Sequence, residues 1–156
     1  LKNFFLEHLP DQGPIRVVHG DYGFHNCLMG PDSRVAAIVD WEISTLGDPL
    51  ADLAYALNPW PDPSDKQPPA PEAATNVPGF PSRTHLAERY AERTGRDLSN
   101  LNYYVGFNRW KTACIVHGVY ARYREGKKST DGADLETLRM RIDSSLTLAQ
   151  EAVDQL

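Results

Sequence analysis

Residues 19–26 read HGDYGFHN, and residues 38–55 read IVDWEISTLGDPLADLAY. The first stretch places Asp21 and Asn26 on a polar segment that contains two glycines. The second stretch places Asp40 at the end of an apolar run, fourteen residues after Asn26. The fold and the function both depend on whether the chain brings these three side chains to one point.

Short apolar runs lie on both sides of the first stretch, over residues 15–19 and 26–30. Residues 35–40 (VAAIVD) form a continuous apolar run that ends in an acid, which is typical of a short buried strand. The tetrapeptide GPDS at 30–33 is a turn signature between the last two runs. We therefore predict a small β-ribbon in which Asn26 and Asp40 converge.

Helical patterns cover most of the remaining sequence. We expect the end of a helix within residues 1–9, and a second helix from Pro49 with Asp48 as its cap. Further helices are predicted over about 82–94, from a cap near Ser99 to Gly126, and from near Asp131 onward. On the long helix that ends at Gly126, we expect one stripe to be Leu101, Val105, Asn108, Thr112, Ile115 and Val119. The last helix has its stripe at Leu135, Leu138, Ile142, Leu146, Ala149 and Val153.

Residues 59–81 hold eight of the twelve prolines. This density excludes a helix or a central strand and predicts an extended loop, either a passive linker or a lid that lines the substrate. The predicted fold class is therefore α+β and mainly helical, with a small β-ribbon that carries a functional loop.

The chemistry follows from the residue types at these positions. A carboxylate and an amide oxygen at one point form a site of hard oxygen ligands, which suits Mg²⁺ that also binds substrate phosphates. Asp21 has no cationic partner close by in the sequence, so its carboxylate can accept a proton from an attacking hydroxyl. These are the parts that phosphoryl transfer requires.

The same residues resemble the aminoglycoside phosphotransferase and choline kinase family, which has a protein-kinase-like fold. The family pattern is H-G-D-x-x-x-x-N, then a strand ending in D-W/F-E, then G-D-P-x-x-D-L-A. This sequence matches each fixed position, at His19, Gly20, Asp21, Asn26, Asp40, Trp41, Glu42, Gly47, Asp48, Pro49, Asp52, Leu53 and Ala54. The sequence of residues 44–55 looks most like that of the phosphotransferase domains attached to acyl-CoA dehydrogenases.

The resemblance implies an ATP- and Mg²⁺-dependent kinase that acts on a small-molecule hydroxyl. Asp21 would be the catalytic base, and Asn26 and Asp40 would ligate the metal and so bind the cofactor. The resemblance also implies supporting roles for Asp48 as a helix cap and for Asp52 as an acceptor for the loop backbone. Trp41 would pack, and Glu42 would either approach the metal or substrate or form an ordinary salt bridge.

The supporting set is His19, Gly20, Glu42, Asp48 and Asp52, and the residues expected to line the substrate are His25, Asn108, Arg109 and Trp110.

Two departures from the family pattern stand out. Relatives often carry His or Arg two residues after the catalytic Asp, whereas this chain has Gly23, with His25 as the nearest substitute. In addition, only eighteen residues precede the loop, so the chain resembles a C-terminal lobe (residues 1–156) without the N-terminal nucleotide-binding lobe. The alternative is therefore a non-catalytic remnant that binds a ligand or partner, and we expect self-association through the surface that the missing lobe would cover.

The bulk composition is ordinary for a soluble globular protein. The net charge of −5 argues against nucleic acid or an anionic membrane as the main partner. Two cysteines do not make a disulfide framework, which favours the cytoplasm. A zinc site built from His19, Asp21, His25 and Cys27 is a weaker alternative, because the sequence offers no second Cys or His pair at a suitable spacing.

Overall fold

The computed structural model describes residues 1–11, 13–60, 62, 75–126 and 134–156. Its chain divides into two compact units. One unit consists of residues 11–101, and the other combines residues 1–10 with residues 102–156. Most of the Pro-rich segment 59–81 lies outside the described residues, so its predicted extended form stays a prediction.

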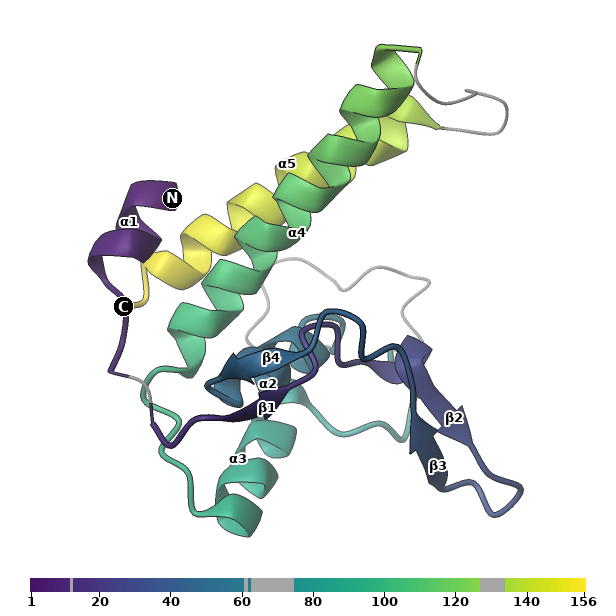
Figure 1. The fold of residues 1–156 in the computed structure, drawn as a ribbon, viewed down its shortest axis with the longest axis vertical. Coiled ribbons are helices and arrows are strands. Elements are labelled where there is room, and N and C mark those ends of the chain that lie inside the picture. Colours follow the sequence, from purple (N-terminus) through teal and green to yellow (C-terminus); the bar gives the residue numbers. More distant parts are fainter. Residues whose placement is uncertain (12, 61, 63–74, 127–133) are drawn as a thin grey trace. The chain divides into compact units, whose positions relative to one another are not determined.

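Two small antiparallel ribbons organise the first unit (Figure 1). β2 (Cys27–Met29) pairs with β3 (Val35–Ile38), in the register Cys27↔Ile38, which confirms the predicted ribbon. β1 (Arg16–Val18) pairs with β4 (Thr45–Gly47), which the sequence did not predict. A short 3-10 turn, η1 (Phe24–Asn26), leads from the polar loop into β2.

The prediction of a buried strand over 35–40 was wrong in its burial. Val35, Ala36 and Ala37 of β3 are exposed, and so is most of β2. The reason is that β2 and β3 make their main contacts with each other, so within this unit no described helix or second sheet packs closely on the faces of the ribbon. A run of apolar residues fits a pleated strand, but it does not by itself say what covers the strand.

Two helices complete this unit. α2 (Leu50–Leu57) buries Leu50, Ala54 and Leu57, while Asp48 Oδ1 accepts the Leu50 N–H at 2.9 Å, as a capping residue does. α3 (Arg83–Thr94) is capped by Ser82 and ends at Gly95, whose φ of 67° is the left-handed conformation that favours glycine. The predicted helix over 82–94 is therefore confirmed at both ends.

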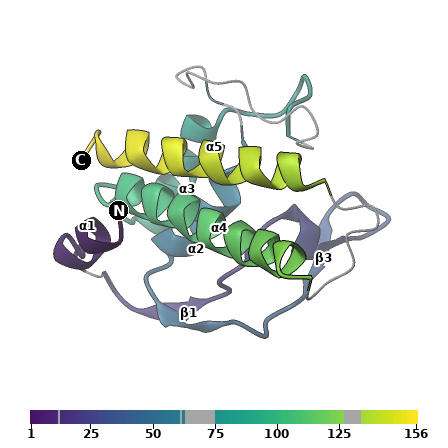
Figure 2. The same cartoon turned by 90° about the horizontal axis from the view of Figure 1, so that it is seen from above.

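The second unit is helical. α1 (Lys2–Glu7) inserts Phe5, which contacts the rings of Tyr103, Phe107 and Trp110, and the Tyr103 hydroxyl donates to the Phe5 carbonyl at 2.7 Å. α4 (Leu101–Arg124) and α5 (Leu135–Val153) lie side by side in both views (Figure 2). They approach closely at Gly106, where a Cβ atom would lie 3.4 Å from the Ala149 carbonyl oxygen.

The stripe predicted for α4 was wrong except at Asn108. On α5 the predicted stripe is mostly half-buried and Ala149 is buried, but Leu146 is exposed and the buried Ala152 was missed. The buried residues of α4 are Tyr103, Tyr104, Gly106, Asn108, Ala113 and Val116, and Ile115 is exposed. Apolar residues occur all round this helix, so their spacing did not single out the face with small residues that allows close packing.

Two expected helix starts also moved. Asp97 accepts the Ser99 N–H in a turn that precedes α4, so Ser99 belongs to this turn and does not cap the helix, which begins at Leu101. Asp134 caps α5 by accepting the N–H groups of Glu136 and Thr137, and the predicted start at Asp131 lies outside the described residues. No helix among the described residues has the length and apolar character needed to cross a membrane.

Candidate active site

The backbone of the loop after β1 is hydrogen-bonded to one carboxylate, that of Asp52. Asp52, in the first turn of α2, accepts the backbone N–H of His19 at 2.5 Å and that of Gly20 at 2.8 Å. Gly20 has a φ of +85°, and a Cβ there would lie 3.0 Å from the Ile43 carbonyl oxygen. Only glycine fits this turn without strain, which explains why glycine stands between His19 and Asp21 in the HGD motif.

His19 connects this loop to the ribbon that carries Asp40. Its buried imidazole donates from Nε2 to the Val39 carbonyl at 2.8 Å, and its Nδ1 accepts the Asp21 N–H at 3.3 Å. These two partners select the tautomer with hydrogen on Nε2. The ring also lies 4.7 Å from that of Trp41, but Trp41 is itself 46% exposed, so its packing role stays a prediction.

Asn26 turns its amide group toward Asp21. Its Nδ2 donates to the Asp21 carbonyl at 2.9 Å and lies 3.3 Å from the Asp21 carboxylate oxygen Oδ2. Because a carbonyl oxygen can only accept, the NH₂ end of this buried side chain must face Asp21. The amide oxygen, which is the end that ligates a metal, therefore points away from Asp21.

Asp40 follows directly after the strand that pairs with the end of the loop. The Asn26 carbonyl accepts the Val39 N–H at 3.0 Å, so Asp40 follows directly after the residue that is hydrogen-bonded to Asn26. Asp40 is exposed and has a φ of +66°, a conformation that costs a residue with a Cβ about 1–2 kcal/mol. Strain of this kind is concentrated at functional sites.

The Asp21 carboxylate is surrounded by donors. Partial burial alone would raise its pKa, but hydrogen bonds from Tyr55, His25 and Asn26 together leave the pKa below its usual value. His25 Nε2 lies 3.3 Å from Asp21 Oδ2. Burial, together with the hydrogen bond that Tyr55 donates to Asp21, raises the pKa of Tyr55, so the phenol stays protonated and remains a donor.

Tyr55 is the site residue that the sequence reasoning missed. It lies three residues after Asp52 on α2, and positions three apart share one face of a helix. Since Asp52 was already expected to meet the loop, this spacing was the available signal.

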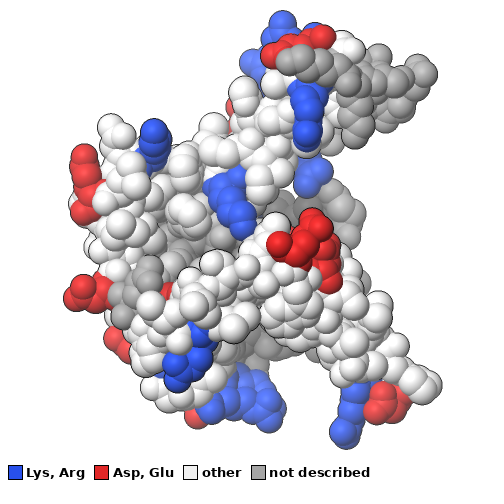
Figure 3. Space-filling model, viewed as in Figure 1, with Lys and Arg blue, Asp and Glu red and all other residues white. Residues whose placement is uncertain are grey.

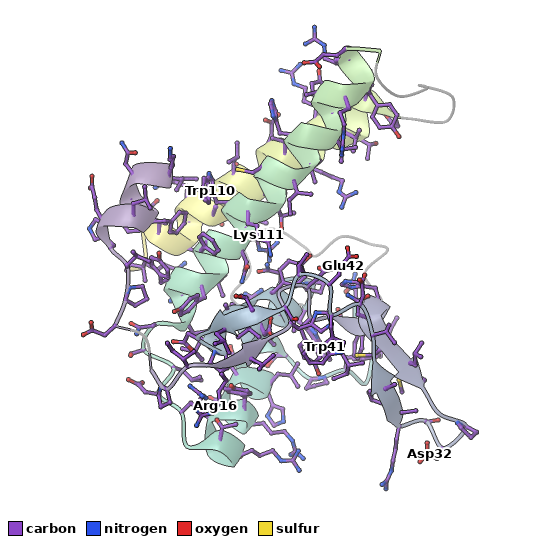
Figure 4. All side chains as sticks on the ribbon, in the orientation of Figure 1. Arg16, Asp32, Trp41, Glu42, Trp110 and Lys111 are labelled. Carbon is purple, nitrogen blue, oxygen red and sulfur yellow. The ribbon has the colours of Figure 1, made fainter. Side chains whose placement is uncertain are left out.

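The other predicted residues are placed as follows. Trp41 and Glu42 lie between β3 and β4 (Figure 4), and Glu42 is exposed. Asn108, Arg109 and Trp110 belong to the other compact unit, so their role in lining the substrate stays a prediction. Among the described residues, no three His, Cys, Asp or Glu side chains gather as a metal cluster. This lends no support to the zinc alternative and does not bear on a pair formed by one amide and one carboxylate.

The chain matches the model of the phosphotransferase enzyme family over residues 1–101. Its fold is similar to the crystal structure of a Ralstonia eutropha protein assigned as an aminoglycoside phosphotransferase. The TM-score is 0.79 at 27% sequence identity, and the match covers 98% of this chain and 47% of that one.

Curated relatives include acyl-CoA dehydrogenase family members. Mouse family member 11 is 32% identical over 164 residues, covering 98% of this chain and 20% of that protein. The chicken protein of the same name is 35% identical over 130 residues, covering 80% and 17%. Mouse family member 10 is 34% identical over 128 residues, covering 79% and 12%. The chain thus spans a fifth or less of these relatives.

Proposed function

Because the chain belongs to the phosphotransferase enzyme family, we propose that it carries the catalytic loop of a kinase that transfers the γ-phosphoryl group of ATP to a hydroxyl of a small molecule. The observation that carries this proposal is the meeting of Asp21 and Asn26 on a loop whose backbone pairs beside Asp40. The family membership supports the reaction class, and these contacts support the roles of the three residues.

Asp21 orients the acceptor hydroxyl and receives its proton. A lowered pKa keeps the carboxylate ionised at neutral pH, so it is ready to accept a hydrogen bond. A weak base is sufficient here, because phosphoryl transfer depends more on positioning and charge than on early proton removal.

Asn26 and Asp40 are the residues that would hold Mg²⁺. The amide oxygen of Asn26 is turned away from Asp21, and the exposed Asp40 follows the residue that pairs with Asn26, so both fit the hard oxygen ligands of this ion. When bound, the ion would neutralise charge on the phosphates of ATP. The strained backbone of Asp40 is consistent with a residue kept for function rather than for stability.

The acceptor is a small hydroxylated metabolite. Figure 3 shows Asp and Glu side chains as well as Lys and Arg side chains on the face in view, and the net charge of −5 supports a small acceptor over a polyanion. The relatives named as acyl-CoA dehydrogenase family members make a hydroxyacyl thioester a sensible first acceptor to test. An aminoglycoside is the second, because of the name of the Ralstonia protein.

The test measures transfer of labelled γ-phosphoryl from ATP to a panel of hydroxylated acceptors, using the protein in its natural full length. We expect Mg²⁺-dependent transfer by the wild type, and loss of that transfer in Asp21→Asn. Asp143→Asn is the matched control, because Asp143 is an exposed carboxylate on α5. Equal rates in the wild type and Asp21→Asn would contradict the proposal and would favour the non-catalytic binding module.

A further inference from the structure

His25 folds back onto the carboxylate of Asp21. Its Nε2 lies 3.3 Å from Asp21 Oδ2, across the short turn η1. An ionised carboxylate can only accept hydrogen bonds, so this nitrogen carries the hydrogen and donates it. The proposed roles of Asp21 and Asn26 do not require this contact, so His25 needs an explanation of its own.

Gly23 supplies the space that the imidazole occupies. A Cβ at position 23 would lie 2.7 Å from His25 Cε1 and 2.9 Å from His25 Nδ1, which is closer than real Cβ contacts. The φ of Gly23 is −172°, an extended conformation that any residue can adopt. The glycine is therefore required by its neighbour's ring and not by its own backbone.

His25 and Asn26 approach the same oxygen of Asp21 from different surroundings. Both donors lie 3.3 Å from Oδ2, yet the His25 side chain is 58% exposed whereas Asn26 is buried. Tyr55 adds a third donor from α2. The rotation of a carboxylate about its last bond is soft, so donors on several sides are what fix it.

We propose that His25 is a positioning residue for Asp21, and that Gly23 serves the same role by leaving the imidazole its place. The inference rests on the proposed function, since the orientation of Asp21 matters only if this carboxylate receives a substrate hydroxyl. It also explains the departure from the family pattern. In this chain, a side chain at position 23 and an imidazole against Asp21 exclude each other.

The kinetic test is a double-mutant cycle in the full natural protein. Gly23→Ala and His25→Ala should each lower kcat about 10- to 100-fold, the usual effect of a misplaced catalytic group, with the KM for ATP unchanged. The double variant should be no worse than either single one, because both remove the same contact. His25→Gln, which keeps an N–H donor, should recover part of the rate.

Two controls match these variants. His85→Ala removes another exposed histidine, and Gly118→Ala adds a Cβ at a position where nothing lies within 4 Å. Neither should change kcat. Multiplicative losses in the double variant, or a wild-type kcat in His25→Ala, would overturn the inference.

A second readout does not depend on catalysis. In protein labelled with ¹⁵N-histidine, Asp21→Asn and Gly23→Ala should each shift the ring nitrogen signals of His25 and leave those of His85 in place. Unchanged His25 signals in both variants would show that the contact is absent and would overturn the inference.

The two proposals can fail separately. An active wild type, an inactive Asp21→Asn and normal His25 variants would overturn only the role of His25. A wild type without transfer activity would overturn the proposed function, and the role of His25 would fall with it.

Discussion

Asp52→Ala should loosen the loop that carries Asp21 without disturbing the rest of the first unit. The Asp52 carboxylate accepts two backbone N–H groups, from His19 at 2.5 Å and from Gly20 at 2.8 Å. Each hydrogen bond to a charged group contributes about 1.5–3 kcal/mol. Asp52 is only partly buried, so water recovers part of this, and we expect a loss of about 2–4 kcal/mol in the free energy of unfolding.

Two measurements check this expectation. Urea unfolding at neutral pH gives the change in stability, and hydrogen exchange of the His19 and Gly20 amides reports on the loop itself. Protection of these two amides should fall about tenfold for each 1.4 kcal/mol lost. Asp52→Asn, which keeps one acceptor oxygen, should cost about half as much as Asp52→Ala.

Asp143→Asn on α5 again serves as the control and should change stability by less than about 0.5 kcal/mol. If Asp52→Ala lowers the free energy of unfolding by less than about 0.5 kcal/mol and leaves hydrogen exchange at His19 and Gly20 unchanged, Asp52 does not stabilise the loop and the reasoning is refuted.

Three further predictions concern other parts of the chain. Asp40→Gly should abolish Mg²⁺-dependent transfer and leave the free energy of unfolding unchanged or raised by up to about 1 kcal/mol, because glycine relieves the φ of +66°. Ser33→Gly, at a φ of +60°, is the control and should keep its activity. A large loss of stability in Asp40→Gly on urea unfolding would contradict the proposed backbone strain. Gly106→Val should lower the free energy of unfolding by about 1–3 kcal/mol, because the valine side chain would collide with α5 and with Phe5. An unchanged midpoint of urea unfolding would mean that α4 and α5 do not pack closely at this position. Hydrogen bonds from the Thr137 side chain and backbone lower the pKa of Asp134 from 3.8, so the stabilisation of α5 by this cap is present above about pH 3.8 and is lost as the pH falls through the folded pKa. Circular dichroism should find this acid-dependent loss of helix in the wild type and not in Asp134→Ser. The same loss in both proteins would exclude the cap as its cause.

The elements that the sequence predicted best were those with local signals. Ser82 and Gly95 mark both ends of α3, and the turn after Gly30 lies between two strands that pair. Such signals act within a few residues, so they can be read without knowing the rest of the fold. The hydrogen bonds from His19 and Gly20 to Asp52 were also expected, because the family pattern links the two segments.

The elements that were missed depend on contacts between distant parts of the chain. β4 is only three residues long and contains a glycine, and it is a strand because β1 lies beside it. The buried face of α4 follows from Phe5 and from the close approach of α5 at Gly106, neither of which the periodicity of α4 contains. Tyr55 is a partner of Asp21 because the loop folds against α2, whereas the contact of His25 with Asp21 is local and depends on the turn η1.

The most direct test is a crystal structure of the natural full-length protein with Mg²⁺ and a non-hydrolysable ATP analogue. We expect the ion to be bound by the Asn26 amide oxygen and an Asp40 carboxylate oxygen at about 2.0–2.1 Å, with Asp21 facing the terminal phosphate. An ion and nucleotide held by other residues, or oxygens at positions 26 and 40 too far apart to share one ion, would contradict the assignment of this loop as the catalytic centre.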